Sequence, residues 1–93
     1  MSEARKLTDA LVEEKLAACV SLIPTVESTY WWKGKIERGE EVLLVIKTQA
    51  GQFKALSKRI KQLHSYTVPE ILALPILAGN PDYLEWLKES TSS

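Results

Sequence analysis

Residues 28–48, STYWWKGKIERGEEVLLVIKT, decide the fold, because they have the pattern of two strands folded back on each other. Residues 28–32 are mostly β-branched or aromatic, and residues 42–46 form an apolar run that strongly favours a strand. Lys33 and Gly34 lie between these runs and can supply a two-residue turn. The stretch therefore predicts a β-hairpin.

The two faces of this hairpin indicate that a second copy of the chain is needed to cover it. A strand with one face in water alternates apolar and polar residues, whereas residues 42–46 include no polar residue. We therefore expect both faces of this strand to be covered. Helices of the same chain can cover only one of them. Trp31 and Trp32 must point to opposite faces, so one of them should enter a core between subunits. Tyr30, Trp31 and Trp32 are the predicted interface residues; the alternative is a tryptophan lying at the rim of its own hairpin.

The composition is that of one small soluble domain, covering residues 1–93. Twelve basic and twelve acidic residues give a formal net charge of zero, which argues against a general binder of nucleic acid or anionic membranes. Cys19 is the only cysteine, so it cannot form an intramolecular disulfide, and its apolar neighbours favour a small buried residue. With no long apolar run and no signal-peptide pattern, we expect a cytoplasmic protein.

Helices are predicted on both sides of the hairpin. Apolar residues recur at three- and four-residue intervals in residues 2–16 and again in residues 53–63. The second of these helices is rich in lysine, which is typical of a solvated face; a phosphate-binding patch is the alternative. The start of a last helix is predicted at residues 80–82. Asn80 can cap this helix, Pro81 suits its first position, and the acidic Asp82 favours the positive end of the helix dipole.

Two further segments with strand character complete the expected order, and the first of them runs into the hairpin. Residues 19–23 lead into the hairpin and are closed by Pro24, which marks a bend, a bulge or an edge. Residues 71–76 are the second segment. The order helix, strand, strand, helix, strand, helix predicts an α+β sandwich of the ferredoxin-like type, with an antiparallel sheet and helices on one face. That fold normally begins with a strand, whereas this sequence begins in the first helix.

Four segments resemble one family, the CutA proteins named for divalent-cation tolerance. They are EEKLAACVSLIP at residues 13–24, the hairpin at residues 28–48, LHSYTVPEILALPI at residues 63–76 and GNPDYLEWLKEST at residues 79–91. The resemblance implies a ferredoxin-like subunit and a very stable homotrimer in which the hairpins form intersubunit contacts. The implied trimer architecture is similar to that of the PII signalling proteins.

The sequence departs from the family pattern in two places. Ser65 stands where family members usually have the proline of a His-Pro-Tyr motif, which can loosen that loop. The family's first strand has no counterpart, and it would lie between residues 71–76 and residues 42–48, so two strand edges should be unpaired. We expect either a sequence shortened at its start, through truncation or a misassigned Met1, or a strand supplied by a neighbouring chain.

His64 is the only histidine and therefore the candidate metal ligand, with Glu70 six residues further on. The alternative is a capping histidine at the end of the basic helix, where the helix dipole favours its protonated form. The resemblance implies copper binding through a first-strand cysteine and histidines of the His-Pro-Tyr region. His64 matches one of those histidines, whereas Leu63 occupies the preceding position and Cys19 does not match the cysteine. One imidazole without these partners is a poor site for copper or another divalent cation in a single chain, and a site assembled from three chains is the open alternative.

The sequence has no pattern typical of an enzyme. It has no nucleophile paired with a histidine by a known motif, no phosphate-binding glycine loop and no pair of carboxylates at a spacing typical of catalysis. Trp31, Lys47, Tyr66 and Glu70 could line a cleft between subunits for a small anionic ligand, or form a polar network that fixes the trimer. We predict a non-enzymatic homotrimer of metal-ion tolerance or sensing. The alternatives are a PII-like regulator that binds a metabolite between subunits, and an assembly scaffold for partner proteins.

Overall fold

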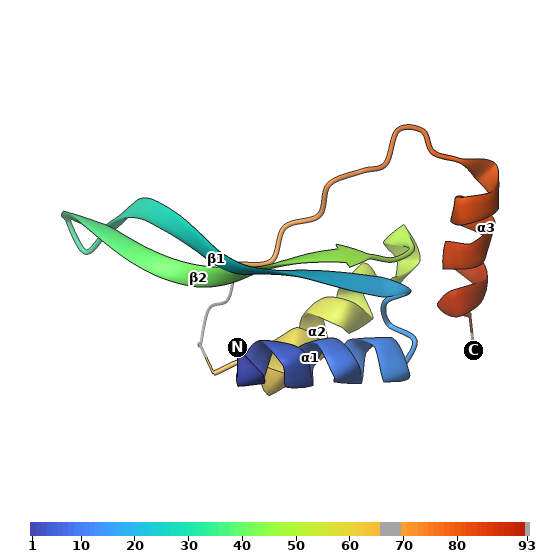
Figure 1. Ribbon diagram of the computed structural model, residues 1–93, viewed down its shortest axis with the longest axis horizontal. Helices are drawn as coiled ribbons and strands as arrows, with labels where there is room; N and C mark the ends of the chain where they lie inside the picture. The colour runs from blue at the N-terminus through green and yellow to red at the C-terminus, as the bar shows by residue number, and fades with distance from the viewer. Residues whose placement is uncertain (66–69, 93) are drawn as a thin grey trace.

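A long hairpin dominates the computed structural model, which describes residues 1–65 and 70–92 (Figure 1). Strand β1, Cys19–Trp32, pairs antiparallel with strand β2, Lys35–Lys47. Between them, Lys33 and Gly34 both have positive φ, 51° and 79°, which is the conformation of the two-residue turns that match the twist of a hairpin. The predicted hairpin and its turn are confirmed.

A β-bulge divides the hairpin. The register shifts between Ile23 and Val26, where Pro24 and Thr25 have no paired partner. Proline has no N–H to donate to the ladder, so a bulge accommodates it without losing a hydrogen bond. The predicted strand at residues 19–23 is therefore the first part of β1, and Pro24 marks a bulge, one of the three roles expected for it.

Two helices cover one face of the hairpin. Helix α1, Ser2–Glu13, and helix α2, Phe53–Leu63, lie side by side beneath the sheet, and a short 3-10 helix η1, Ala50–Gln52, precedes α2 (Figure 1). The buried residues of the two helices, together with Ala17 from the connection after α1, form the core, against which the sheet packs its helix-facing side chains; the buried set is Leu7, Leu11, Ala17, Leu56 and Ile60. The α+β layers predicted from the sequence are thus confirmed.

Helix α1 ends three residues earlier than predicted. It stops at Glu13, and Lys15 adopts a left-handed φ of 60°, which cannot continue a right-handed helix. The N–H groups of Leu16 and Ala17 both donate to the carbonyl of Leu11, which closes the end of the helix. None of the helices in residues 1–65 and 70–92 is long and apolar enough to cross a membrane.

Helix α3, Pro81–Ser90, begins as the sequence predicts. The Asn80 side chain accepts a hydrogen bond from the Asp82 N–H at 2.9 Å. At the other end of α3, buried Thr91 accepts a hydrogen bond from the Gln49 side chain at 2.7 Å. Gln52 donates to the Thr91 carbonyl at 3.0 Å, so these contacts attach α3 to the chain that leads into α2.

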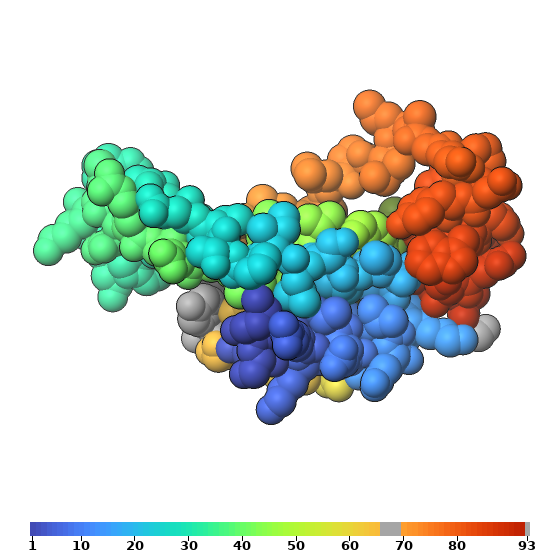
Figure 2. Space-filling view, in the orientation of Figure 1, coloured from blue at the N-terminus to red at the C-terminus, as the bar shows by residue number. Residues whose placement is uncertain are grey.

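The strand predicted at residues 71–76 does not form. Residues 70–79 have no regular secondary structure, and in Figure 2 this orange part of the chain starts beside the sheet and then rises away from it. A strand needs a neighbour to hydrogen-bond with, and in the described residues the sheet contains only β1 and β2. Ile71 packs against the core, but the large apolar side chains that follow are strongly exposed; they are Leu72, Leu74, Ile76 and Leu77.

The outer edges of both strands are free in the part of the chain that the structure describes. Leu44 and Ile46 of β2 face the helices and are half-buried, whereas Leu43 and Val45 point to the other face and are exposed. The prediction that a second copy covers this other face remains a prediction.

Candidate functional site

The hairpin tip carries the most exposed aromatic side chains of the described residues. It projects well beyond the two helices of the lower layer (Figure 1). Trp31 is 72% exposed and Trp32 is 59% exposed, and Tyr30 is exposed as well. Trp31 and Trp32 are consecutive in β1, so they point to opposite faces of the ribbon. The Lys33 ammonium lies 5.8 Å from the centre of the Trp32 ring, a cation–π contact between neighbouring residues at the start of the turn.

His64 occupies the position immediately after α2. Its N–H donates to the Ile60 carbonyl at 2.8 Å, so the residue closes the last turn of the helix, and its side chain is half-buried. Exposed carbonyl groups at a helix C-terminus favour a cation beside them. Glu70 is exposed, and Tyr66, predicted for the ligand cleft, lies outside the described residues.

The carboxylate of Glu3 on α1 anchors the chain next to His64. It accepts the Ser65 N–H at 2.9 Å and the Ser65 hydroxyl at 3.2 Å. These two hydrogen bonds, the backbone one first, lower the pKa of Glu3 below its usual range. Sequence reasoning missed this contact, because the two residues lie far apart in the chain and no motif links them.

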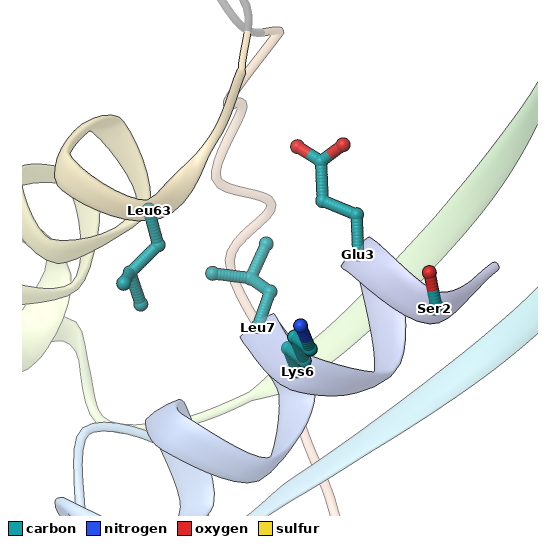
Figure 3. Close-up of a pocket in the computed structure, with 5 residues that line it drawn as sticks. All are labelled: Ser2, Glu3, Lys6, Leu7 and Leu63. Carbon is teal, nitrogen blue, oxygen red and sulfur yellow. The ribbon is translucent and has the colours of Figure 1, made fainter.

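A hollow of about 270 Å³ lies below this anchor, between α1 and the end of α2 (Figure 3). Leu7 and Leu63 extend into the space between the helices, and the Glu3 carboxylate points away from them toward the connection after α2. Ser2 and Lys6 complete the lining. The hollow offers an apolar floor and a single carboxylate that is already hydrogen-bonded, so it does not provide a set of metal ligands.

Lys47 lies at the opposite end of the hairpin from Trp31. It is the last residue of β2, where it faces Cys19, whereas Trp31 pairs with Ile36 beside the turn. A strand rises about 3.3 Å per residue, so the distance between the two ends is roughly 40 Å. The register also places Lys47 and Trp31 on opposite faces. One chain therefore does not bring these predicted cleft residues together.

The described residues of one chain do not assemble a metal site either. No group of three or more His, Cys, Asp or Glu side chains in residues 1–65 and 70–92 could hold an ion. Imidazole suits copper, but an ion needs further ligands to complete its coordination. A site that uses His64 must therefore draw ligands from beyond the described residues of one subunit.

The fold and the hairpin match a known family. The model of the CutA1 divalent ion tolerance protein family matches residues 1–90. The chain belongs to this family. The divalent-cation tolerance protein CutA of Thermus thermophilus is 52% identical over 88 residues, which are 95% of this chain and 85% of that protein. The chloroplastic protein CutA 1 of rice is 51% identical over 94% of this chain, which spans only 49% of the rice protein.

A solved CutA1 structure from Thermus thermophilus superposes with a TM-score of 0.94 at 50% identity, over 98% of this chain and 88% of that one. CutA1 membership and this likeness confirm the predicted ferredoxin-like α+β class. The candidate residues of this CutA1 chain separate into three places: the aromatic tip, the His64 connection and the Lys47 end of the hairpin. Any site that combines two of them joins different subunits or different parts of the chain.

Proposed function

We propose that this chain works as a non-enzymatic homotrimer in the tolerance or sensing of divalent metal ions, in the cytoplasm. The observation that carries the proposal is the match to the divalent ion tolerance family over residues 1–90. A relative 52% identical over nearly the whole chain is named for divalent-cation tolerance. The proposal treats the chain as a binding and assembly module, with no catalytic step.

Exposed apolar surface on the hairpin supports assembly. Trp31 and Trp32 at the tip, and Leu43 and Val45 on the sheet face away from the helices, are all exposed in the single chain. Large apolar patches of this kind mark interaction surfaces, because leaving them in water is costly. Copies of the same chain, packed through their hairpins, would cover them.

The ion is proposed to bind between copies. Within the described residues one chain offers no group of three candidate ligands, but a trimer contains three copies of every candidate ligand. His64 supplies the imidazole and Glu70 a carboxylate, and both types of group bind divalent metals, with imidazole favouring copper. In this arrangement metal binding depends on assembly.

A copper titration followed by calorimetry tests the metal part of the proposal. His64→Ala should weaken copper binding by at least about tenfold, because it removes the only imidazole of the chain. Gln62→Ala, two residues earlier on the exposed face of α2, is the matched control and should bind like the wild type. Identical isotherms for the wild type and His64→Ala would refute a role for His64.

A further inference from the structure

Helix α2 carries a row of lysines on the side that faces away from the core. Residues 42–69 include no aspartate or glutamate, although the whole chain has a formal net charge of zero. Lys54, Lys58 and Lys61 are all exposed, and their spacing of four and three residues places them on one side of the helix. Leu56 and Ile60, on the opposite side of α2, are buried in the core. The three lysines form the lysine stripe.

The positive charge of the lysine stripe is not compensated within the part of the chain that the structure describes. Arg59, the other basic residue of α2, forms an ion pair with Glu14 of α1 at 2.9 Å, whereas the three lysines form none within residues 1–65 and 70–92. Lys54 and Lys58 are four residues apart, so their charges repel each other. Lys54 also lies in the first turn of α2, where the helix dipole disfavours a cation. An anionic partner would offset both costs.

The lysine stripe remains accessible in the trimer proposed above. That assembly covers the hairpin tip and the sheet face away from the helices, whereas α2 lies in the layer beneath the other face of the sheet (Figure 1). The stripe points away from this layer's core, because the opposite side of α2 is the buried one. A shallow depression runs between the outer side chains of the helix; it is lined by Phe53, Lys54, Ser57, Lys58, Lys61 and Gln62.

We propose that the lysine stripe binds an acidic, extended peptide segment of a partner protein. Along the helix axis the stripe is about 10 Å long, at 1.5 Å per residue. In an extended peptide every second side chain points to the same side, so three carboxylates at alternate positions span about 13 Å. The long lysine side chains accommodate this difference in length. Each ammonium group can therefore meet one carboxylate, and the charges of the two surfaces are complementary.

A peptide with carboxylates suits the lysine stripe better than a phosphate group or a nucleic acid does. Bidentate recognition of phosphate is typical of arginine, and the Nε and Nη2 groups of Arg59 already donate to the Glu14 carboxylate at 2.9 Å each. A nucleic-acid binder neutralises many phosphates over a broad basic surface, whereas this chain has a net charge of zero. Three exposed ion pairs give weak, salt-dependent binding, which three stripes in one trimer would strengthen through multivalency.

An NMR titration of the full chain with a peptide in which three glutamates alternate with glycine tests the proposal. The backbone amide signals of α2 around the lysine stripe should shift, whereas those of α3 should not. Added salt should weaken the binding, because it screens exposed charges. A peptide with lysine in place of each glutamate should cause no shifts. Unchanged α2 signals up to about 1 mM of the acidic peptide would overturn the proposal.

Two triple variants separate the lysine stripe from the total charge of the protein. Glutamine at all three stripe positions should weaken binding of the acidic peptide by about tenfold. The matched control removes the same charge at three exposed lysines outside α2 and should bind like the wild type; it combines Lys6→Gln, Lys15→Gln and Lys88→Gln. Equal weakening in both triple variants would overturn the proposal. Single-stranded DNA or inorganic phosphate that binds the stripe more tightly than the peptide does would overturn the choice of a peptide partner.

Discussion

Replacing Trp31 by alanine should separate assembly from folding. The side chain is 72% exposed in the single chain, so its loss should leave the subunit fold unchanged. With about 250 Å² for a tryptophan, this exposed part is roughly 180 Å². Burying half to all of it between subunits contributes about 2–4.5 kcal/mol per interface, at roughly 25 cal/mol per Å², or roughly 30- to 1,600-fold in affinity. The double variant Trp31→Ala plus Trp32→Ala should weaken assembly further.

Sedimentation equilibrium over a wide concentration range, together with circular dichroism, measures both effects. We expect the wild type to remain trimeric where Trp31→Ala dissociates, with the same far-ultraviolet spectrum. Phe53→Ala is the matched control, because it removes an exposed aromatic ring from the helical layer, and it should leave assembly unchanged. A trimer equally stable in the wild type and the double tryptophan variant would refute the argument that the tip is an interface.

Three further predictions concern the subunit itself. Leu11→Ala should lower the free energy of unfolding by about 2–5 kcal/mol, because Leu11 is fully buried, whereas the exposed neighbour Val12→Ala should cost far less in a urea titration. Gly34→Ala should cost about 1 kcal/mol, because alanine is strained at a φ of 79°; no loss of stability would contradict the turn geometry. The lowered pKa of Glu3 means that its contacts stabilise the fold above the pKa of the unfolded chain and are lost as pH falls through the folded pKa. In a carboxyl NMR titration, Ser65→Pro, which removes both donors, should raise the pKa of Glu3 more than Ser65→Ala does, and equal shifts would contradict the backbone contribution.

The sequence predicted the local elements well where the signals were local. Lys33 and Gly34 specify the turn, Asn80 caps α3 as expected, and the apolar period of α2 gives its residues correctly. The error at residues 71–76 has a different origin. An apolar run forms a strand only when it pairs with a neighbouring edge, and within the described residues only β1 and β2 pair with each other.

The candidate site was only partly accessible from the sequence. His64 was correctly placed at the end of α2, but its neighbourhood depends on Glu3, which a sequence pattern cannot connect to Ser65. The contact of Cys19 with Lys47 could have been found only by counting the register through the bulge, and the presence of Pro24 did not by itself specify a one-residue shift. Whether Trp31 and Lys47 share a cleft depends on how copies assemble, which no pattern within one chain describes.

Native mass spectrometry in the presence of copper tests the central claim most directly, because it counts chains and ions in the same particle. The proposal of an ion held between subunits predicts that copper appears on trimers and not on monomers, and that His64→Ala trimers carry none. Monomers that bind copper as well as trimers do, or His64→Ala trimers that retain it, would contradict the account.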